Sequence, residues 1–350
     1  MTFASAPGRV NLIGEHTDYN AGLVLPAVIP QRTLVELRPR RDDQIVVWSR
    51  EIGAWATYRL GHERRRRDWL DYVMGCTAML RDAGHRIAGS ELRIASQVPL
   101  GGGLSSSAAL EVAVLRALRT AYDLPIDDVE LALIGQRAEA RFVGVPVGAM
   151  DQLAASLGRL GSALFIDLRS LEIHLLALPA VDLVVIGSGL RHDHAAGDYR
   201  TRRAECEDAA RRLGVRTLRE VGIADLPAIA ALPPPLDRRA RHVVTENARV
   251  RAAVHAIETS DLRALGEQLA AGHASMRDDF EASLPEIDRL VAIAGADPAI
   301  WGARITGGGF GGAIVALAKR SQAAAAAARI AAGYLAETGI RPHILVPGGA

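Results

Sequence analysis

The stretch P-L-G-G-G-L-S-S-S-A-A-L, Pro99 to Leu110, joins three glycines and three serines to a segment with helical apolar spacing. A bare backbone at a helix N-terminus presents unpaired N–H groups and the positive end of the helix dipole, which attract anions. We therefore expect a phosphate-binding loop. Lys319 is the only lysine, so G-x-x-x-x-G-K-[ST] and the protein-kinase V-A-I-K set are absent. The loop belongs to a different class of phosphate site.

Composition excludes several classes of protein. The 350 residues allow two domains of ordinary size, and 49% hydrophobic with 23% charged residues is typical of a globular chain. A net charge of +1 argues against nucleic acid or an acidic membrane as partner. Cys76 and Cys206 lack C-x-x-C spacing, so neither zinc nor a disulfide framework is indicated. With no signal core and no long apolar run, we expect a cytoplasmic enzyme in a reducing compartment. We also expect a monomer.

The order of elements predicts an α+β fold. Strand patterns occur in the first half, at 10–13, 22–29, 33–37 and 45–48, and the second half is rich in helical patterns, at 200–213, 237–259, 262–280 and 321–337. Two further helices are expected, at 69–80 and 127–143, the latter beginning at a capping box formed by Asp127 and Glu130. Without βα alternation, a doubly wound sheet is disfavoured.

A second glycine-rich segment resembles a dinucleotide motif only superficially. Gly307, Gly309 and Gly312 match G-x-G-x-x-G, but the residues that follow, A-I-V-A-L-A, have the pattern of a strand. A dinucleotide-binding fingerprint opens a helix instead. We therefore interpret T-G-G-G-F-G-G as a tight β-to-β or helix-capping loop close to another backbone.

Two polar segments suggest chemistry. Glu15, His16 and Asp18 form a dense cluster suited to vicinal hydroxyls, since a carboxylate accepts several hydrogen bonds; a divalent-metal site and a plain turn are the alternatives. Asp151 follows a Gly/Pro-containing turn and is a candidate general base or orienting residue for a hydroxyl nucleophile, or else a helix N-cap. Glu139 is expected to close a helix. The loop serines could also bind Mg²⁺.

Together these segments resemble the GHMP small-molecule kinases, and within them the galactokinases, over nearly the whole chain. G-R-V-N-L-I-G-E-H-T-D-Y-N looks like the galactokinase signature, P-L-G-G-G-L-S-S-S-A like the superfamily ATP loop, and R-I-T-G-G-G-F-G-G like its third motif. Residues 239–250 and 276–288 also look like galactokinase segments, which argues against a mevalonate or homoserine kinase. One departure is G-S-G-L-R-H-D-H at 187–194, where the family more often has N-S-N-x-K/R.

The resemblance implies roles for matching residues. Asp151 is implied as the catalytic aspartate and Arg9 as the arginine that assists it. The implied sugar contacts are Glu15, His16, Asp18, Gly148, Asp151 and Tyr199. The implied ATP-binding residues are Gly101, Gly102, Gly103, Leu104, Ser105, Ser106, Ser107, Ala108 and Trp69, the last lining the adenine pocket. Ser107 and Glu139 are the implied Mg²⁺ ligands.

The family fold implied is a ribosomal-S5-domain-2-like N-terminal domain, expected here over 1–180, and a ferredoxin-like C-terminal domain over 181–350, with the active site in the cleft between them. The implied reaction is ATP-dependent phosphorylation of galactose at its C1 hydroxyl, the first committed step of galactose breakdown by the Leloir pathway. A kinase for N-acetylgalactosamine, arabinose or galacturonate, and a non-catalytic sugar sensor, are the alternatives. The complete set of Arg9, Ser107, Glu139 and Asp151 counts against the sensor.

Overall fold

The computed structural model describes residues 1–190 and 195–347. Contacts between residues divide the chain into two compact units. Unit 1 comprises Met1–Arg9 and Val28–Leu160, and unit 2 comprises Val10–Ala27 and Gly161–Ala350. A domain boundary after residue 180 stays a prediction. Within the described part of the chain, no helix is both long and apolar enough to cross a bilayer.

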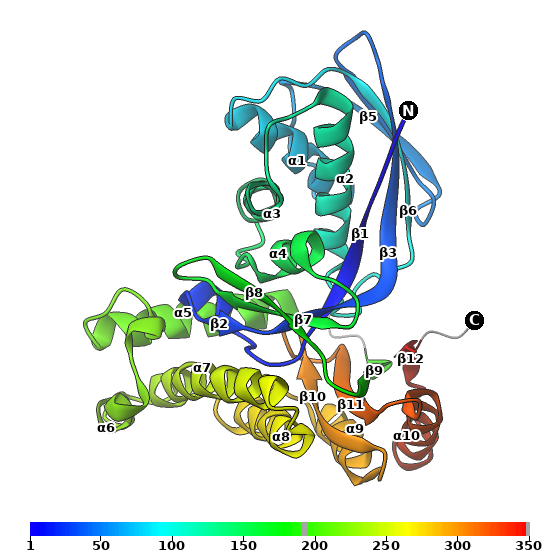
Figure 1. Cartoon of the computed structure of the whole chain (residues 1–350). Helices are drawn as coiled ribbons and strands as arrows, with labels where there is room; N and C mark the ends of the chain where they lie inside the picture. The colour runs from blue at the N-terminus through cyan, green and yellow to red at the C-terminus, as the bar shows by residue number, and fades with distance from the viewer. Residues whose placement is uncertain (191–194, 348–350) are drawn as a thin grey trace. The chain divides into compact units, whose positions relative to one another are not determined.

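Unit 1 is built on a twisted sheet (Figure 1). Its strands are β1 (Thr2–Asn11), β3 (Pro26–Pro39), β4 (Gln44–Ser49), β5 (Ala54–Arg59) and β6 (Ser90–Ser96), in the order β3-β6-β4-β5 with β1 also paired to β3. The pairing of β4 with β6 is parallel. Side chains alternate across the sheet, as the pleat requires, so Val35 and Leu37 of β3 enter the core while Leu34 faces outward.

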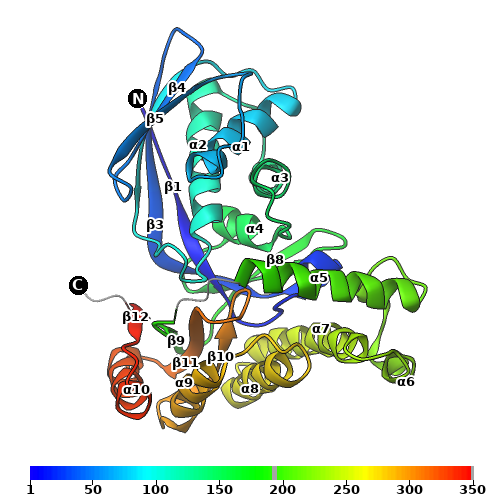
Figure 2. The same cartoon turned by 180° about the vertical axis from the view of Figure 1, so that it is seen from behind.

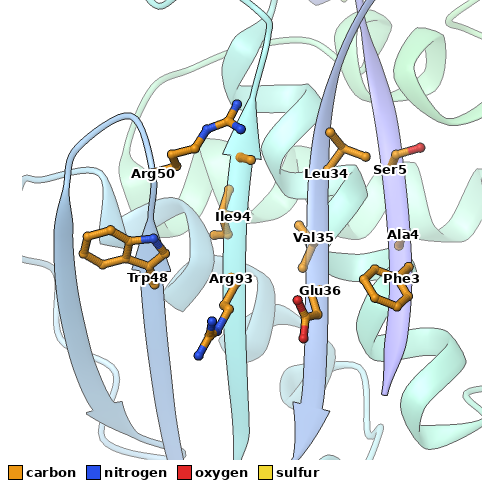
Figure 3. A pocket seen from close by; sticks show the side chains of 11 residues that line it. Phe3, Ala4, Ser5, Leu34, Val35, Glu36, Trp48, Arg50, Arg93 and Ile94 are labelled. Carbon is orange, nitrogen blue, oxygen red and sulfur yellow. The ribbon is translucent and has the colours of Figure 1, made fainter.

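The helices of unit 1 are α1 (Leu70–Asp82), α2 (Ser106–Tyr122), α3 (Asp128–Arg137) and α4 (Met150–Leu157), with a π-helical turn over Ala138–Val143. Residues of α1, α2 and α3 share one buried apolar cluster with the sheet. The opposite face of the sheet carries a shallow groove of about 520 Å³ whose lining includes Phe3, Leu34 and Trp48 (Figure 3).

Unit 2 contains two sets of strands. β2 (Leu23–Val24), β7 (Ser162–Asp167) and β8 (Glu172–Ala177) pair antiparallel, and a separate sheet has the order β10-β11-β9-β12. The strands of that sheet are β9 (Val181–Gly187), β10 (Ile300–Thr306), β11 (Ala313–Lys319) and β12 (His343–Val346), all antiparallel.

Helices make up much of unit 2 (Figure 2). They supply most of the residues of its apolar core. They are α5 (Ala195–Arg212), α6 (Leu226–Ala230), α7 (Leu236–Glu258), α8 (Leu262–Asp278), α9 (Pro285–Ala296) and α10 (Ala323–Thr338), with 3₁₀ turns at Asp18–Asn20, Leu218–Glu220 and Ile223–Asp225. Pro233, Pro234 and Pro235 lie between α6 and α7.

The α+β expectation is confirmed, and most element predictions hold to within a few residues. Asp127 caps α3, its carboxylate accepting a hydrogen bond from the Glu130 N–H at 2.7 Å. Several details differ. The strand expected at 10–13 ends at Asn11, and the strands expected at 22–29 and 33–37 are largely one strand, β3. The helix expected over 127–143 changes from α to π geometry at Ala138, and β5, α6 and α9 are additional elements. Such a π turn is common at functional sites, because it rotates the side chains that follow it.

Candidate functional site

The glycine- and serine-rich loop leads into α2, as expected. Gly101 and Gly103 have φ values of +71° and +72°, and Ser105 also has a positive φ of +56°. Glycine adopts this region without strain, which is why the loop is glycine-rich. Ser106 and Ser107 are the first two residues of a helix of 17 residues. The loop therefore presents its backbone at a helix N-terminus, an arrangement suited to phosphate.

Arg9 and Asp151 form a bidentate pair. The Nε and Nη2 atoms of Arg9 donate to Oδ1 and Oδ2 of Asp151 at 2.7 and 2.6 Å. Nη1 of the same guanidinium donates to the carbonyl oxygen of Gly103 at 2.7 Å. The Ser105 hydroxyl also donates to Oδ2 of Asp151. Both predicted catalytic residues thus lie together at the phosphate loop, with Asp151 in the first turn of α4.

The predicted magnesium ligands also lie close to each other. Glu139 is within the π turn, so the expectation that it closes a helix is wrong: the helix continues to Val143 with a wider turn. Burial, followed by the charge of Asp151, raises the pKa of Glu139 to about 7, while a hydrogen bond with Ser107 lowers it. A cation bound here would relieve this cost, and hydroxyl and carboxylate oxygens are the ligands that Mg²⁺ prefers. The pair fits Mg²⁺.

Among the described residues, no group of three or more His, Cys, Asp or Glu is arranged to hold a metal ion. A cation at Ser107 and Glu139 would therefore need further ligands, and nucleotide phosphate oxygens with water are the usual ones for Mg²⁺.

Two buried residues behind this pair escaped sequence analysis. The amide Nε2 of Gln152 donates to Glu139 at 2.7 Å and to Glu111 at 2.9 Å. Burial and the charge of Glu139 raise the pKa of Glu111 well above its ordinary value. The only sequence signal was that Gln152 follows Asp151 directly and that Glu111 is a charged residue on an apolar helix face.

Trp69 lines a small apolar pocket next to the phosphate loop. The cavity has a volume of about 90 Å³, and its lining includes Leu100 and Ser106 of the loop region, Leu110 of α2 and Ile52. An apolar pocket beside a phosphate site is the arrangement that a nucleotide base requires. The adenine-lining role implied for Trp69 stays a prediction.

Four of the predicted sugar contacts, Glu15, His16, Asp18 and Tyr199, belong to unit 2. His16 is buried, and its ring lies against Phe280 and Tyr199 with centroid distances of 4.4 and 5.5 Å. Its Nδ1 atom hydrogen bonds to the hydroxyl of Tyr19 at 2.9 Å. Burial, followed by the nearby His242, lowers the pKa of His16 to about 3, so its imidazole is neutral at physiological pH.

Glu15 and Asp18 flank His16 in the same turn. Glu15 is only 1% exposed, and its carboxylate pairs with the guanidinium of Arg304 in β10. Asp18 is half-buried at the start of a 3₁₀ turn. Gly148 belongs to unit 1, in the segment just before α4.

The third motif forms the loop between β10 and β11, which confirms a tight β-to-β loop. The N–H of Phe310 donates to the carbonyl oxygen of Ala282 at 2.8 Å, and a Cβ on Gly309 would lie 2.4 Å from that oxygen. A Cβ on Gly308 would meet the ring of Tyr199 at 3.5 Å. The loop thus packs against the aromatic group around His16. In the 187–194 departure, residues 191–194 lie outside the described residues.

Known proteins resemble both the domains and the signature. Residues 71–159 match the GHMP kinases N terminal domain, residues 253–336 the GHMP kinases C terminal domain, and residues 2–39 the galactokinase galactose-binding signature. Galactokinases of Pasteurella multocida and Actinobacillus succinogenes are 44% and 42% identical, each over 97% of this chain and 91% of the relative.

Solved structures of GHMP kinases resemble this chain over nearly its whole length. The Lactococcus lactis galactokinase complexed with galactose has a TM-score of 0.93 at 33% identity, covering 98% of this chain and 92% of that one. A mevalonate kinase, with a TM-score of 0.71 at 16% identity over 98% of both chains, shares the fold. The full-length identity and the matched signature show that this chain belongs to the galactokinase family of the GHMP kinases.

Proposed function

We propose that this enzyme transfers the γ-phosphoryl group of ATP to the C1 hydroxyl of D-galactose, giving α-D-galactose 1-phosphate and ADP. The observation that carries the proposal is the Arg9–Asp151 pair at the glycine- and serine-rich loop. The galactose-binding signature over residues 2–39 supports the choice of sugar. As a member of a kinase family, the chain uses ATP.

Asp151 is the residue proposed to receive the C1 hydroxyl. Its Oδ2 atom already accepts hydrogen bonds from Arg9 and Ser105, whereas Oδ1 accepts one, from Arg9. A carboxylate oxygen accepts about two hydrogen bonds, so Oδ1 keeps room for one more donor. The guanidinium prevents the carboxylate from rotating. Asp151 would thus orient the hydroxyl for in-line attack, and Arg9 would offset charge near the transferred group.

Ser107 and Glu139 are the proposed protein ligands of Mg²⁺. Bound Mg²⁺ would supply charge neutralisation at the nucleotide phosphates. Gln152 holds the Glu139 carboxylate through a hydrogen bond of 2.7 Å, so the ligand is fixed before any ion binds. The backbone of residues 101–108 is proposed to bind the phosphates and Trp69 to contact the adenine.

Recognition of the sugar is proposed for Glu15, His16, Asp18 and Tyr199, together with Gly148 and Asp151. The neutral imidazole of His16 lies among aromatic rings that can pack against the apolar face of a pyranose. Polar groups aimed at ring hydroxyls would lose their partners when a hydroxyl is inverted, and such losses discriminate by roughly 10⁴-fold. Galactose should therefore be preferred strongly to glucose, which differs at C4.

The test is a coupled ADP assay on one preparation, with galactose, glucose, 2-deoxygalactose, N-acetylgalactosamine, arabinose and galacturonate as substrates. We expect galactose to have the highest kcat/KM. A kcat/KM for glucose within tenfold of that for galactose would refute recognition at C4. A higher kcat/KM for N-acetylgalactosamine than for galactose would identify N-acetylgalactosamine as the substrate. Binding of sugar without any ADP release would indicate a sensor. A monomeric state and a cytoplasmic location stay predictions.

A further inference from the structure

A charged arginine lies completely inside unit 2. Arg304 of β10 is 0% exposed, and its Nη1 atom donates to Oε1 of Glu246 in α7 at 2.7 Å. Its Nη2 atom pairs with the carboxylate of Glu15. Burying a charge is costly unless partners surround it, so this arrangement requires both carboxylates. Glu246 is also 0% exposed. None of the roles assigned above uses Glu246 or Arg304.

Glu246 connects this buried pair to the backbone of the sugar signature. Its Oε1 atom accepts a hydrogen bond from the N–H of Gly14 at 2.9 Å, and its Oε2 atom accepts one from Nε of Arg249 at 2.7 Å. Burial alone would raise the pKa of Glu246, but Arg304 and Arg249 together hold it well below its ordinary value. The two arginines thus favour the anionic form of Glu246.

The turn that these groups support is conformationally demanding. Gly14 has a φ of +105° and His16 a φ of +59°, which is uncommon for a residue with a side chain. His242 adds a third contact, because its Nε2 atom lies 3.1 Å from the carbonyl oxygen of Glu15. Residues of α7 and β10 thus contact three groups of this turn: the Gly14 N–H, the Glu15 carbonyl and the Glu15 carboxylate.

We propose that Glu246 and Arg304 are positioning residues for sugar binding. They fix the Glu15 carboxylate and the turn that carries His16 and Asp18, without contacting the sugar themselves. The inference rests on the proposed function of these three residues. It assigns part of the sugar specificity to a buried ion pair on α7 and β10.

The packing of α8 offers a way to disturb Arg304 without changing any charge. A Cβ on Gly272 would lie 2.5 Å from Nη1 of Arg304, so Gly272→Ala pushes on the guanidinium. Glu246→Gln retains the size of the side chain and an oxygen for the Gly14 N–H but removes the charge that Arg304 needs. Arg304→Met removes the guanidinium, and Arg304→Lys restores a positive charge.

The matched control is the ion pair of Arg219 with Asp167, joined at 2.6 Å in the same unit with side chains 10% and 12% exposed. Neither Arg219 nor Asp167 contributes to the turn at Gly14–His16. Arg219→Met therefore reports the effect of losing a largely buried ion pair as such.

The experiment measures kcat, KM for galactose, KM for ATP, the dissociation constant of galactose by calorimetry, and Tm for each variant. We expect Glu246→Gln and Arg304→Met to raise KM and the dissociation constant for galactose at least tenfold, with KM for ATP within threefold. Arg304→Lys should recover part of the loss. Arg219→Met should lower Tm with galactose affinity unchanged.

Equal galactose affinity in Glu246→Gln, Gly272→Ala and the control would show that the buried pair only stabilises the fold, and would overturn the inference. Should Arg304→Met fail to fold, the galactose affinities of Glu246→Gln and Gly272→Ala decide between the two explanations. A parallel rise in KM for ATP would also contradict a role confined to the sugar. A wild type that neither binds nor phosphorylates galactose refutes the proposed function itself, which separates the two failures.

Discussion

The guanidinium of Arg9 binds both carboxylate oxygens of Asp151, at 2.7 and 2.6 Å, although 142 positions separate the two residues in the sequence. Arg9 is nearly buried and Asp151 is more exposed, with side-chain exposures of 6% and 23%. The arginine therefore acts as a fixed support, and the aspartate remains accessible to a substrate. A bidentate pair of this kind sets the plane of the carboxylate as well as its charge.

Asp151→Ala should lower kcat by about 10²- to 10⁴-fold, the range for general acid–base assistance, because the C1 hydroxyl loses the group that receives it. Nucleotide affinity, measured by calorimetry, should change little. Arg9→Lys keeps a positive charge but loses the two-point contact, so we expect an intermediate rate. An Asp151→Ala rate above about a tenth of wild type, an effect of only ~1.4 kcal/mol, would contradict the assignment.

Glu139→Gln should raise the Mg²⁺ concentration needed for half-maximal activity by at least tenfold, because the variant loses a charged oxygen ligand. Binding of Mn²⁺ in the presence of a non-hydrolysable ATP analogue, followed by electron paramagnetic resonance, provides a second readout. Glu130→Gln is the control, since the Glu130 side chain is 46% exposed on α3. Tight stoichiometric Mg²⁺ binding without nucleotide would argue against this site.

Trp69→Ala should raise KM for ATP by about tenfold, or ~1.4 kcal/mol, because the pocket beside the phosphate loop loses its aromatic wall. KM for galactose should stay within twofold. Trp55→Ala serves as the comparison, since Trp55 is 52% exposed. Equal effects of the two substitutions on KM for ATP would refute the adenine-lining role.

Gly309→Ala should lower the free energy of unfolding by about 2 kcal/mol more than Gly312→Ala, as expected for overpacking. Both glycines have similar φ values, +79° and +80°, so both substitutions carry the cost of a left-handed backbone. Only Gly309 faces an obstacle, the carbonyl oxygen of Ala282 at 2.4 Å, whereas a Cβ on Gly312 meets nothing within 4 Å. Denaturant unfolding of both variants measures the difference, and equal losses would contradict it.

His242 should make the free energy of unfolding fall as the pH drops below 6.5. Burial lowers its pKa from 6.5 to about 4, so between these values the unfolded chain binds the proton and the folded chain does not. The contribution of His242 to the free energy of unfolding is fully present above pH 6.5. It declines by up to about 1.4 kcal/mol per pH unit as the pH falls from 6.5 to about 4.

The measurement compares the free energy of unfolding of wild type with that of His242→Gln. Buried Glu139, whose pKa is raised, changes this free energy in the opposite direction over the same pH range. Because Glu139 is present in both proteins, its effect cancels in the comparison. We expect the wild type to lose more unfolding free energy between pH 7 and pH 5 than the variant does. Identical pH dependence of the two proteins would show that His242 is protonated as easily in the folded chain as in the unfolded one.

The sequence by itself determined the local features of this protein. The glycines of residues 101–103 and the helical spacing after Ser105 predicted a loop before a helix, and Asp127 predicted the start of α3. These signals are local because backbone freedom, helix capping and apolar periodicity act between residues a few positions apart. The motifs quoted from residues 8–20, 99–110 and 304–312 were also sufficient to suggest the family.

Only the tertiary structure decided which charged groups meet. Only the family resemblance suggested that Arg9 assists Asp151. Nothing in the sequence joins Gln152 to Glu111 or places Arg304 beside Glu15, since each pair comes from distant elements that packing brings together. The sequence also does not predict the direction of a pKa shift. Glu139 and Glu246 are both buried glutamates on helical turns, yet the pKa of Glu139 is raised and that of Glu246 is lowered. Neighbouring charge decides this outcome, and folding alone supplies the neighbours.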